Sequence, residues 1–209
     1  MIPNRFLSIW LSKETNELPP TPYVESWRRL MPDYEHVQIT IEDAYRDSRF
    51  IREALDAENW RAASDYIRAR YLYEHGGMYH DLDAEAITRF DDLLDNTCFC
   101  GCEDVLRVNN AVMGAEAGHW FLKEYLFHLD DMYRGDCDPR FSIFAGPGLL
   151  TLMLGRYGWR HRDEDIMISD IQIYNSKYFY PFHYTESFSP DCITGQTHAI
   201  HYWASLSER

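Results

Sequence analysis

The segment YEHGGMYHDLDAEAI, residues 73–87, places two glycines and then two aspartates in an otherwise apolar, strand-like run. Its composition predicts that Asp81 and Asp83 lie close to the protein interior. Burying one carboxylate costs several kcal/mol unless it is paired, and a second carboxylate beside it adds repulsion. A fold that accommodates this segment must therefore bring positive charge to the pair.

The length and composition of the chain predict one folded domain over residues 1–209. Apolar residues make up 45% of the sequence and aromatic residues 15%, and no linker-like stretch divides it. The final residues, SLSER, leave open that this domain is part of a longer protein. The net charge of −14, without any run of Lys or Arg, argues against nucleic acid and anionic lipid as partners.

The cysteines and the apolar stretches indicate a cytoplasmic protein without an integral membrane segment. The N-terminal residues MIPNRFLSIW lack the long apolar region of a signal peptide, and the five cysteines form an odd set. We expect buried free thiols rather than a zinc site, which usually needs two separated Cys/His pairs. The most apolar stretch, residues 141–155, is too short to span a bilayer and is broken by Gly146-Pro147-Gly148.

The order of predicted elements indicates an α/β fold around a mostly parallel sheet. Apolar and β-branched runs predict strands over residues 6–11, 34–41, 78–82, 98–105 and 109–116, and shorter strands within 165–182 and 197–203. Helical spacing predicts helices over 23–31, 42–56, 59–75, 118–135 and, after Pro147, up to residue 158. The aspartates then lie at the carboxyl end of a strand, where open α/β sheets bind ligands.

The two aspartates suit a hard divalent cation. In an extended chain, residues two apart point to the same side, so Asp81 and Asp83 should share a face while Leu82 packs the other way. Carboxylate oxygens are ligands for Mg²⁺ or Mn²⁺, which keep positions open for substrate phosphates. A D-x-D sequence alone is also compatible with a solvated turn, because the chain contains 34 Asp and Glu residues.

The flanking residues make the signal more specific. The run AASDYIRARYLYEHGGMYHDLDAEAI resembles the signature of the D-x-D sugar-transferase family, which includes capsular polysaccharide glycosyltransferases, fungal initiating mannosyltransferases and, distantly, clostridial glucosylating toxins. The segments FLSIW, ESWRRLMPDYE, NNAVMGAEAGHWFL, GPGLLT and HAIHYW follow in the family's order. Two positions depart from the pattern: the opening strand reads Ser8-Ile9-Trp10 without a His before Trp, and His80 replaces an apolar residue.

The resemblance implies a GT-A fold, a Rossmann-like α/β/α sandwich with a central mostly parallel sheet. It also implies a metal-dependent, retaining hexosyltransferase that uses Mn²⁺ or Mg²⁺. The donor would be a nucleoside-diphosphate sugar, with UDP favoured over GDP, and the acceptor a glycan or glycoconjugate in polysaccharide or glycoprotein biosynthesis.

Site roles follow from the resemblance together with the chemistry of the residues. For the metal we expect Asp83 as a direct ligand, Asp81 beside it as a partner of metal-bound water and of ribose or sugar hydroxyls, and His201 as third ligand, with His198 as its competitor. Asp81, Asp83 and Arg68 form the expected catalytic set. The expected donor-binding residues are Trp10, Asp65, Arg68, Tyr79, Asp81, Asn110 and Trp203.

Each of these residues also has a purely structural interpretation. Asp65 and Arg68 could form an ordinary helix ion pair, Trp10 and Tyr79 could pack in the core, and Asn110 could belong to a turn. Two other functions remain open: a Mg²⁺-dependent phosphohydrolase and a non-catalytic sugar- or metal-binding module. A phosphohydrolase usually has a small hydroxyl-rich turn after the second Asp, whereas this chain has Ala84-Glu85. No residue stands out as a catalytic base or nucleophile.

Overall fold

The computed structural model describes residues 1–19, 21–131 and 145–204. Its main sheet has seven strands in the order β2-β1-β3-β6-β5-β8-β7. The strands are β1 (Arg5–Ile9), β2 (Glu35–Ile39), β3 (Gly77–His80), β5 (Cys98–Asp104), β6 (Arg107–Ala115), β7 (Ile166–Ile168) and β8 (Ile171–Tyr174). Strands β2, β1, β3, β5 and β8 run in one direction, whereas β6 and β7 are antiparallel to their neighbours. This confirms the predicted α/β fold with a mostly parallel sheet.

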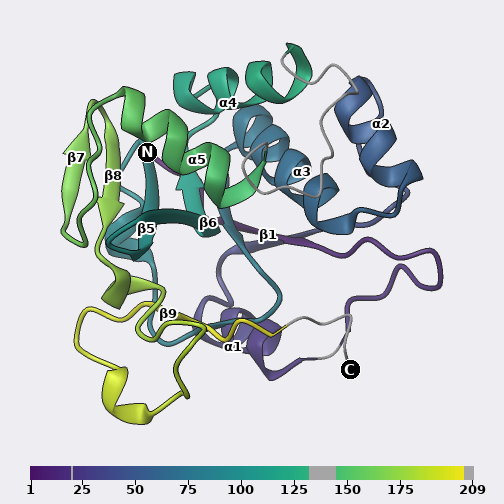
Figure 1. Cartoon of the computed structure of the whole chain (residues 1–209). Helices are drawn as coiled ribbons and strands as arrows, with labels where there is room; N and C mark the ends of the chain where they lie inside the picture. The colour runs from purple at the N-terminus through teal and green to yellow at the C-terminus, as the bar shows by residue number, and fades with distance from the viewer. Residues whose placement is uncertain (20, 132–144, 205–209) are drawn as a thin grey trace.

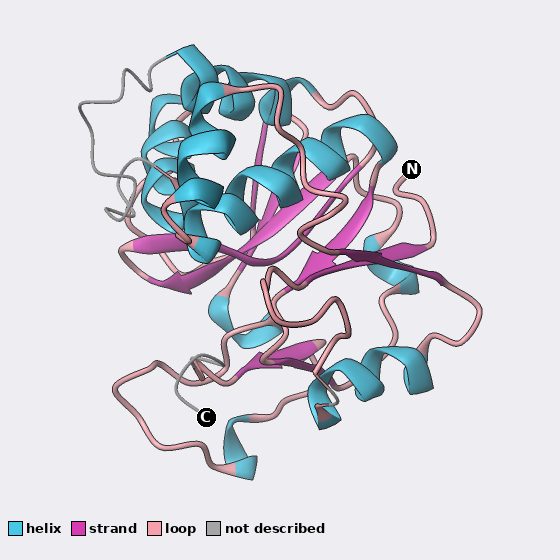
Figure 2. Ribbon diagram, turned by 90° about the vertical axis from the view of Figure 1, so that its right-hand side faces the viewer, coloured by secondary structure: helices cyan, strands magenta, loops and turns pink. Residues whose placement is uncertain are grey.

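Helices cover one face of this sheet, and the opposite face carries a second, smaller layer (Figures 1 and 2). The first group comprises α2 (Arg49–Asp56), α3 (Trp60–His75), α4 (Trp120–Asp131) and α5 (Gly146–Arg156). The second layer contains α1 (Pro22–Leu30) and a two-stranded antiparallel sheet of β4 (Ala84–Ala86) and β9 (Ala199–His201). Short 3₁₀ turns lie at Asp91–Leu93, Ser176–Tyr178 and Pro190–Cys192.

Local signals explain why α3 runs directly into the strand that carries the aspartates. The side chain of Asn59 accepts a hydrogen bond from the Ala62 N–H and so caps the start of the helix. Gly76 and Gly77 end it at φ angles of 68° and 114°, a region that disfavours residues with a Cβ. Strand β3 begins at Gly77, so no loop separates helix from strand.

Two local expectations were wrong. The helix predicted over 42–56 begins only at Arg49, after the cap residue Ser48, because the side chain of Asp43 binds the N–H and hydroxyl of Thr40 and holds a turn. The D-x-D segment is not extended, since the Ala84 N–H donates to the Asp81 carbonyl at 3.0 Å and closes a turn. The last residues of the helix predicted over 118–135 lie outside the described residues.

The main core lies between the helices and the sheet, and it includes the side chains of Cys98, Cys100 and Cys102. All three thiols are buried and free, as predicted, and burial raises the pKa of each of them. Cys192 is also free but only partly buried, which corrects the expectation for that residue. Cys137 lies outside the described residues.

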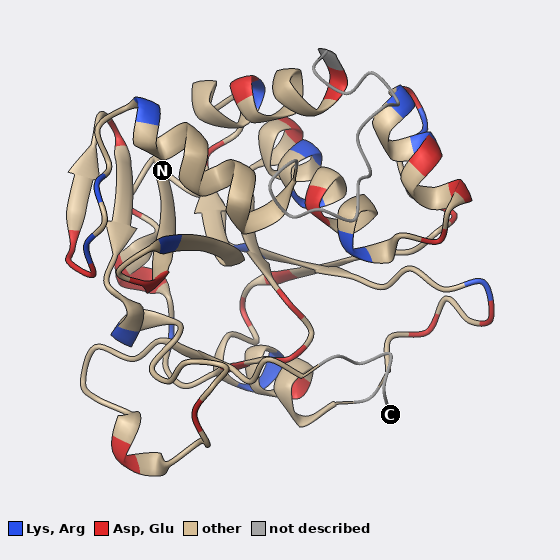
Figure 3. Ribbon diagram, viewed as in Figure 1, with Lys and Arg blue, Asp and Glu red and all other residues tan. Residues whose placement is uncertain are grey.

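The charged residues are distributed over many elements. Figure 3 shows Lys and Arg interspersed with Asp and Glu rather than collected along one element. This agrees with the absence of a Lys/Arg run in the sequence. Within the described residues, no helix is both long enough and apolar enough to cross a membrane.

Candidate active site

A cleft of about 1020 Å³ opens at the carboxyl ends of β1 and β3. Every residue that the sequence predicts for catalysis, donor binding or metal binding contributes to its lining: Trp10, Asp65, Arg68, Tyr79, Asp81, Asp83, Asn110, His201 and Trp203. The competing histidine, His198, does not line the cleft and instead contacts Asp92 at 3.1 Å. The tertiary structure thus gathers residues from distant parts of the chain into a single concave site, which is the usual shape of a ligand site.

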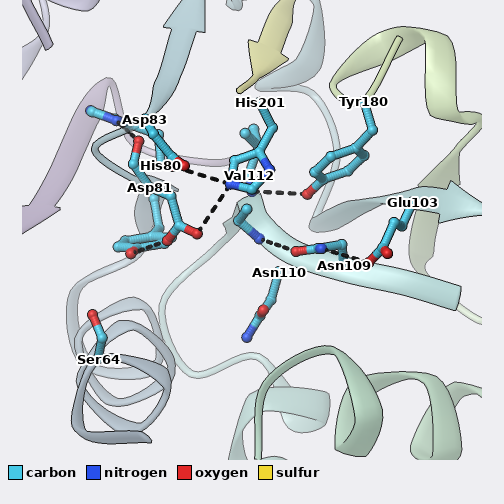
Figure 4. A network of polar contacts seen from close by, with 12 residues as sticks. Ser64, His80, Asp81, Asp83, Glu103, Asn109, Asn110, Val112, Tyr180 and His201 are labelled. Atoms are coloured by element: carbon cyan, nitrogen blue, oxygen red, sulfur yellow. Dashed lines mark hydrogen bonds and ion pairs between the residues drawn. The ribbon is translucent and has the colours of Figure 1, made fainter. Parts of the chain in front are cut away.

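The two aspartates meet the imidazole of His201 (Figure 4). Its Nε2 atom lies 3.1 Å from Asp83 Oδ1 and 3.5 Å from Asp81 Oδ2. Strand pairing produces this contact, because β4 begins directly after Asp83 and places Ala84 opposite His201 in β9. The turn over the D-x-D segment lets both carboxylates reach one imidazole, although the chain is not extended there.

The neighbouring charges in this cluster shift the pKa values of His201 and Asp81. Burial alone would lower the pKa of His201, but hydrogen bonds and charge from Asp81 and Asp83 outweigh burial and raise it above the ordinary value. Burial would likewise raise the pKa of Asp81, but Arg68 and His201 hold it below its usual range. Arg68 and the His201 imidazole, whose raised pKa favours its charged form, are thus the positive partners of the buried Asp83 and the partly buried Asp81.

The same three side chains fit a divalent metal ion. Two carboxylate oxygens and one imidazole nitrogen lie within 4.8 Å of one another, close enough to bind the same metal ion. Oxygen and imidazole ligands of this kind suit Mn²⁺, and oxygen-rich sites suit Mg²⁺. A bound cation would replace the proton on His201 as the partner of the carboxylates.

Arg68 lies at the centre of the second polar group in the cleft. Its side chain is only 6% exposed, and its Nη2 atom lies 3.4 Å from Asp65 and 3.3 Å from Asp81. The guanidinium carbon stands 4.1 Å from the ring centroid of Tyr79, whose hydroxyl donates to Asp81. The predicted Asp65–Arg68 pairing on one helix face is confirmed, but it is a buried network rather than a surface ion pair.

An irregularity in β6 extends this network. The pairing of β5 with β6 shifts register between Phe99 and Gly101, which leaves backbone groups of β6 free for side chains. Arg68 Nη1 donates to the carbonyl of Asn110 at 2.8 Å, and Asn110 Nδ2 donates to Asp65 at 3.0 Å. Asn110 is therefore held in the cleft wall by Asp65 and by Arg68, and Arg68 also contacts Asp81.

Asp65 also packs against the first residue of α5. A Cβ added to Gly146 would lie 2.6 Å from Asp65 Oδ2, and the φ angle of Gly146 is 57°. The G-P-G sequence therefore has a specific steric reason, because only a glycine leaves room for the carboxylate at this backbone conformation.

The two predicted tryptophans lie in different surroundings. Trp10 directly follows β1, and its backbone N–H donates a hydrogen bond to the Ile39 carbonyl. The indole ring therefore lies at the end of the sheet, where it lines the cleft. The indole of Trp203 stands edge-on to His201 with ring centroids 4.4 Å apart and donates to the Phe182 carbonyl. Trp203 has a φ angle of 59°, which is uncommon for a residue with a Cβ.

The two departures from the family pattern contact each other. Ser8 Oγ lies 3.2 Å from His80 Nε2 across the neighbouring strands β1 and β3. His80 also stacks on Trp27 with a centroid distance of 4.1 Å and an interplanar angle of 5°. Burial lowers the pKa of His80 to about 4, so this ring is neutral near pH 7. Ser8 and His80, at the two places where the sequence departs from the family pattern, therefore pack together next to the D-x-D turn.

Sequence reasoning overlooked Glu103 and Arg107 as lining residues of the cleft. Asn109, expected together with Asn110 to begin a strand and either bind sugar hydroxyls or belong to a turn, does line it. Glu103 ends a segment whose apolar and cysteine residues favour a strand, and nothing in its spacing from Asp83 indicates a shared cavity. Only the pairing of β5 and β6 brings it there.

Comparisons with known proteins agree with this site. Residues 21–100 match the family model "Glycosyltransferase sugar-binding region containing DXD motif", and residues 114–209 match "Alpha 1,4-glycosyltransferase conserved region". A solved structure described as "PaToxG Glycosyltransferase" has a TM-score of 0.58 at 16% identity, covering 74% of this chain and 69% of that one. The protein has the GT-A fold of glycosyltransferases.

Two curated fungal proteins are similar in sequence. Inositol phosphoceramide mannosyltransferase 3 of Schizosaccharomyces pombe is 28% identical over 154 residues, which is 70% of this chain and 43% of that protein. Mannosyl phosphorylinositol ceramide synthase SUR1 of Saccharomyces cerevisiae is 33% identical over 142 residues, 63% of this chain and 36% of that protein.

The chain belongs to the DXD-motif glycosyltransferase family. It spans less than half the length of these curated relatives. That residues 1–209 form a single domain, and that the protein is cytoplasmic, stay predictions.

Proposed function

We propose that this protein is a metal-dependent, retaining glycosyltransferase that moves a hexose from a nucleoside-diphosphate sugar to a hydroxyl group of a glycoconjugate. The observation that carries the proposal is the cluster of Asp81, Asp83 and His201 at one side of a cleft. A cation held there can act as a Lewis acid on the departing diphosphate. The family membership supports the same reaction class.

The residues around the cluster have distinct proposed roles. Asp83 and His201 hold the metal, and Asp81 completes the site while it accepts from the Tyr79 hydroxyl. Arg68 and Asp65 orient the donor sugar, since their buried network keeps a fixed geometry beside Asp81. Asn110 offers its side chain to the same sugar from β6.

Two aromatic residues complete the donor site in this proposal. Trp10 offers a flat apolar face to the nucleobase at the end of β1. Trp203, which contacts the metal cluster through His201, covers the donor. No enzymic base is required if the departing phosphate oxygen accepts the proton of the acceptor hydroxyl.

Experiments must distinguish between a few chemical classes of donor and of acceptor. The sequence favours a UDP-sugar, whereas one curated relative is named a mannosyltransferase and the other a mannosyl phosphorylinositol ceramide synthase, so GDP-mannose is tested on an equal footing. The relatives' names also indicate an inositol phosphoceramide acceptor for those proteins. A polyhydroxylated glycoconjugate is the acceptor class that we propose here.

The deciding experiment incubates the protein with GDP-mannose, UDP-glucose and UDP-galactose, each with Mn²⁺, with Mg²⁺ or with EDTA. Release of the nucleoside diphosphate with at least one donor, abolished by EDTA, is the expected result. Release of inorganic phosphate from p-nitrophenyl phosphate would favour the phosphohydrolase instead. Binding without any product would favour a non-catalytic module and would contradict the proposal.

A further inference from the structure

Glu103 is a buried carboxylate in the cleft that the donor site does not use. The residue is 5% exposed, at the end of β5. Its Oε2 atom accepts from Asn109 Nδ2 at 2.9 Å, and its Oε1 atom lies 3.8 Å from Arg107, whose side chain is 52% exposed. A carboxylate can accept about four hydrogen bonds. Within residues 1–19, 21–131 and 145–204, this one firm partner leaves most of the capacity unmet, which is costly for a buried carboxylate.

The position of Glu103 separates it from the proposed donor residues. Figure 4 shows Glu103 and Asn109 on the other side of His201 from the D-x-D aspartates. Glu103, Asn109 and Tyr184 line the same cleft as the proposed donor residues. The cleft therefore continues past the metal cluster into a region that a donor held at Trp10 and Asp83 does not need.

We propose that Glu103 binds hydroxyl groups of the acceptor, an inference that rests on the proposed transferase function. Sugar and inositol hydroxyls donate hydrogen bonds to a carboxylate, and such charge-assisted bonds are the stronger kind. Asn109 fixes the carboxylate so that its free lone pairs stay available to the acceptor. A negative charge here also disfavours a phosphate at this point. The acceptor therefore presents an uncharged polyol ring to Glu103 and carries any phosphate elsewhere.

A second metal site at Glu103 is a weaker interpretation of the same side chains. Glu103, Asp104 and His183 approach one another closely enough to ligate a cation. However, Asp104 Oδ1 accepts from the Leu106 N–H at 2.6 Å, and His183 Nδ1 lies 2.7 Å from Thr185 Oγ1. His183 Nε2 and Asp104 Oδ2 face each other at 3.6 Å, so these two residues are held as a pair, whereas Glu103 lines the cleft.

The test separates acceptor use from donor use in the full chain. Donor hydrolysis without acceptor and transfer to octyl α-mannoside, octyl β-glucoside and myo-inositol are measured for the wild type, Glu103→Gln and Glu103→Asp. Asp104→Asn is the matched control, because it removes the neighbouring carboxylate outside the cleft lining. Melting temperatures are recorded for every variant. Glu103→Asp keeps the charge but shortens its reach, so it serves if Glu103→Gln fails to fold.

We expect both Glu103 variants to lower kcat/KM for the acceptor about tenfold or more, the effect of one hydrogen bond to a charged group. Donor hydrolysis and the donor KM should stay within about twofold of the wild type, since no proposed donor contact is removed. Unchanged transfer, or hydrolysis that falls in parallel with transfer, would overturn the role of Glu103 alone. A wild type that neither hydrolyses nor transfers any donor would overturn the proposed function, and this inference with it.

Discussion

The Nε2 atom of His201 lies 3.1 Å from the Asp83 carboxylate, although the two residues come from opposite halves of the chain. Their contact depends on the pairing of β4 with β9, which sets Ala84 opposite His201. The last strand of the described chain thus contributes His201 to the proposed metal site and also belongs to the small sheet. This relationship joins the D-x-D segment and β9 in one cluster of side chains.

Removing the Asp83 carboxylate should abolish metal-dependent nucleotide binding. In Asp83→Ala we expect the affinity for GDP or UDP in the presence of Mn²⁺ to fall by roughly 100-fold or more, because a metal ligand is lost. The fold should survive, since Asp81 and His201 can still pair at 3.5 Å. Calorimetric titrations with and without Mn²⁺ measure the effect.

Asp92→Ala provides the control for Asp83→Ala. Asp92 lies in the 3₁₀ turn Asp91–Leu93 and contacts His198. Its side chain is 66% exposed and does not line the cleft. Its affinity should match that of the wild type. Equal Mn²⁺-dependent affinity in Asp83→Ala and the wild type would refute the metal assignment.

Loss of the buried Arg68 should destabilise the fold far more than loss of the partly exposed Arg70 from the same helix. Arg68→Ala leaves Asp65 without its cation, and we expect a loss of about 3–5 kcal/mol in the free energy of unfolding. Arg70, whose side chain is 27% exposed, contacts Asp47 and Glu74, and Arg70→Ala should cost about 1 kcal/mol or less. Urea unfolding of both variants decides; similar losses would show that the Arg68 network is not special.

Gly146→Ala should destabilise the protein and displace Asp65. The new Cβ would lie 2.6 Å from the carboxylate, and the φ angle of 57° disfavours any side chain. We expect a cost of roughly 1–3 kcal/mol together with weaker donor binding. The control is Gly155→Ala in the same helix, where nothing lies within 4 Å of the added Cβ.

The glycine pair should respond with opposite signs in a thermal unfolding experiment. Gly155→Ala should stabilise α5 by about 0.5–1 kcal/mol, because alanine lowers the entropy of the unfolded chain. A Gly146→Ala variant with unchanged melting temperature would argue against the close approach of Asp65.

A pH dependence of stability should come from His119, which lies outside the active site. Its Nδ1 atom accepts the Phe121 N–H at 3.3 Å and caps the start of α4, and its Nε2 atom faces Asp170 at 3.5 Å. Burial lowers the pKa of His119 below the ordinary value of 6.5. The folded chain therefore holds fewer protons at His119 than the unfolded chain in mild acid. Its contribution is complete above pH 6.5 and is lost as the pH falls.

His119→Asn tests this titration. Asparagine is a good helix cap and does not titrate, so the variant keeps the acceptor without the charge. We expect the free energy of unfolding to fall less between pH 7.5 and pH 5.5 in the variant than in the wild type. The same fall in both proteins would exclude His119 as the source.

Short-range patterns were enough to predict the elements that surround the D-x-D segment. Helix α3 between Asn59 and Gly76 carries its own cap, apolar face and termination signal, so its formation needs little information from distant residues. The acidic segment before α2 was predicted wrongly, because the Asp43 side chain competes with helix formation at Thr40.

The D-x-D segment and the residues that flank it already indicated the family and the chemical character of the site, since two neighbouring carboxylates need a positive partner once they are taken out of water. Tertiary structure decided which partners they obtain. It selected His201 over His198, shaped the D-x-D segment as a turn and brought Glu103 into the cleft. These outcomes depend on strand pairing and register between distant segments, and local sequence carries almost no record of such long-range pairing.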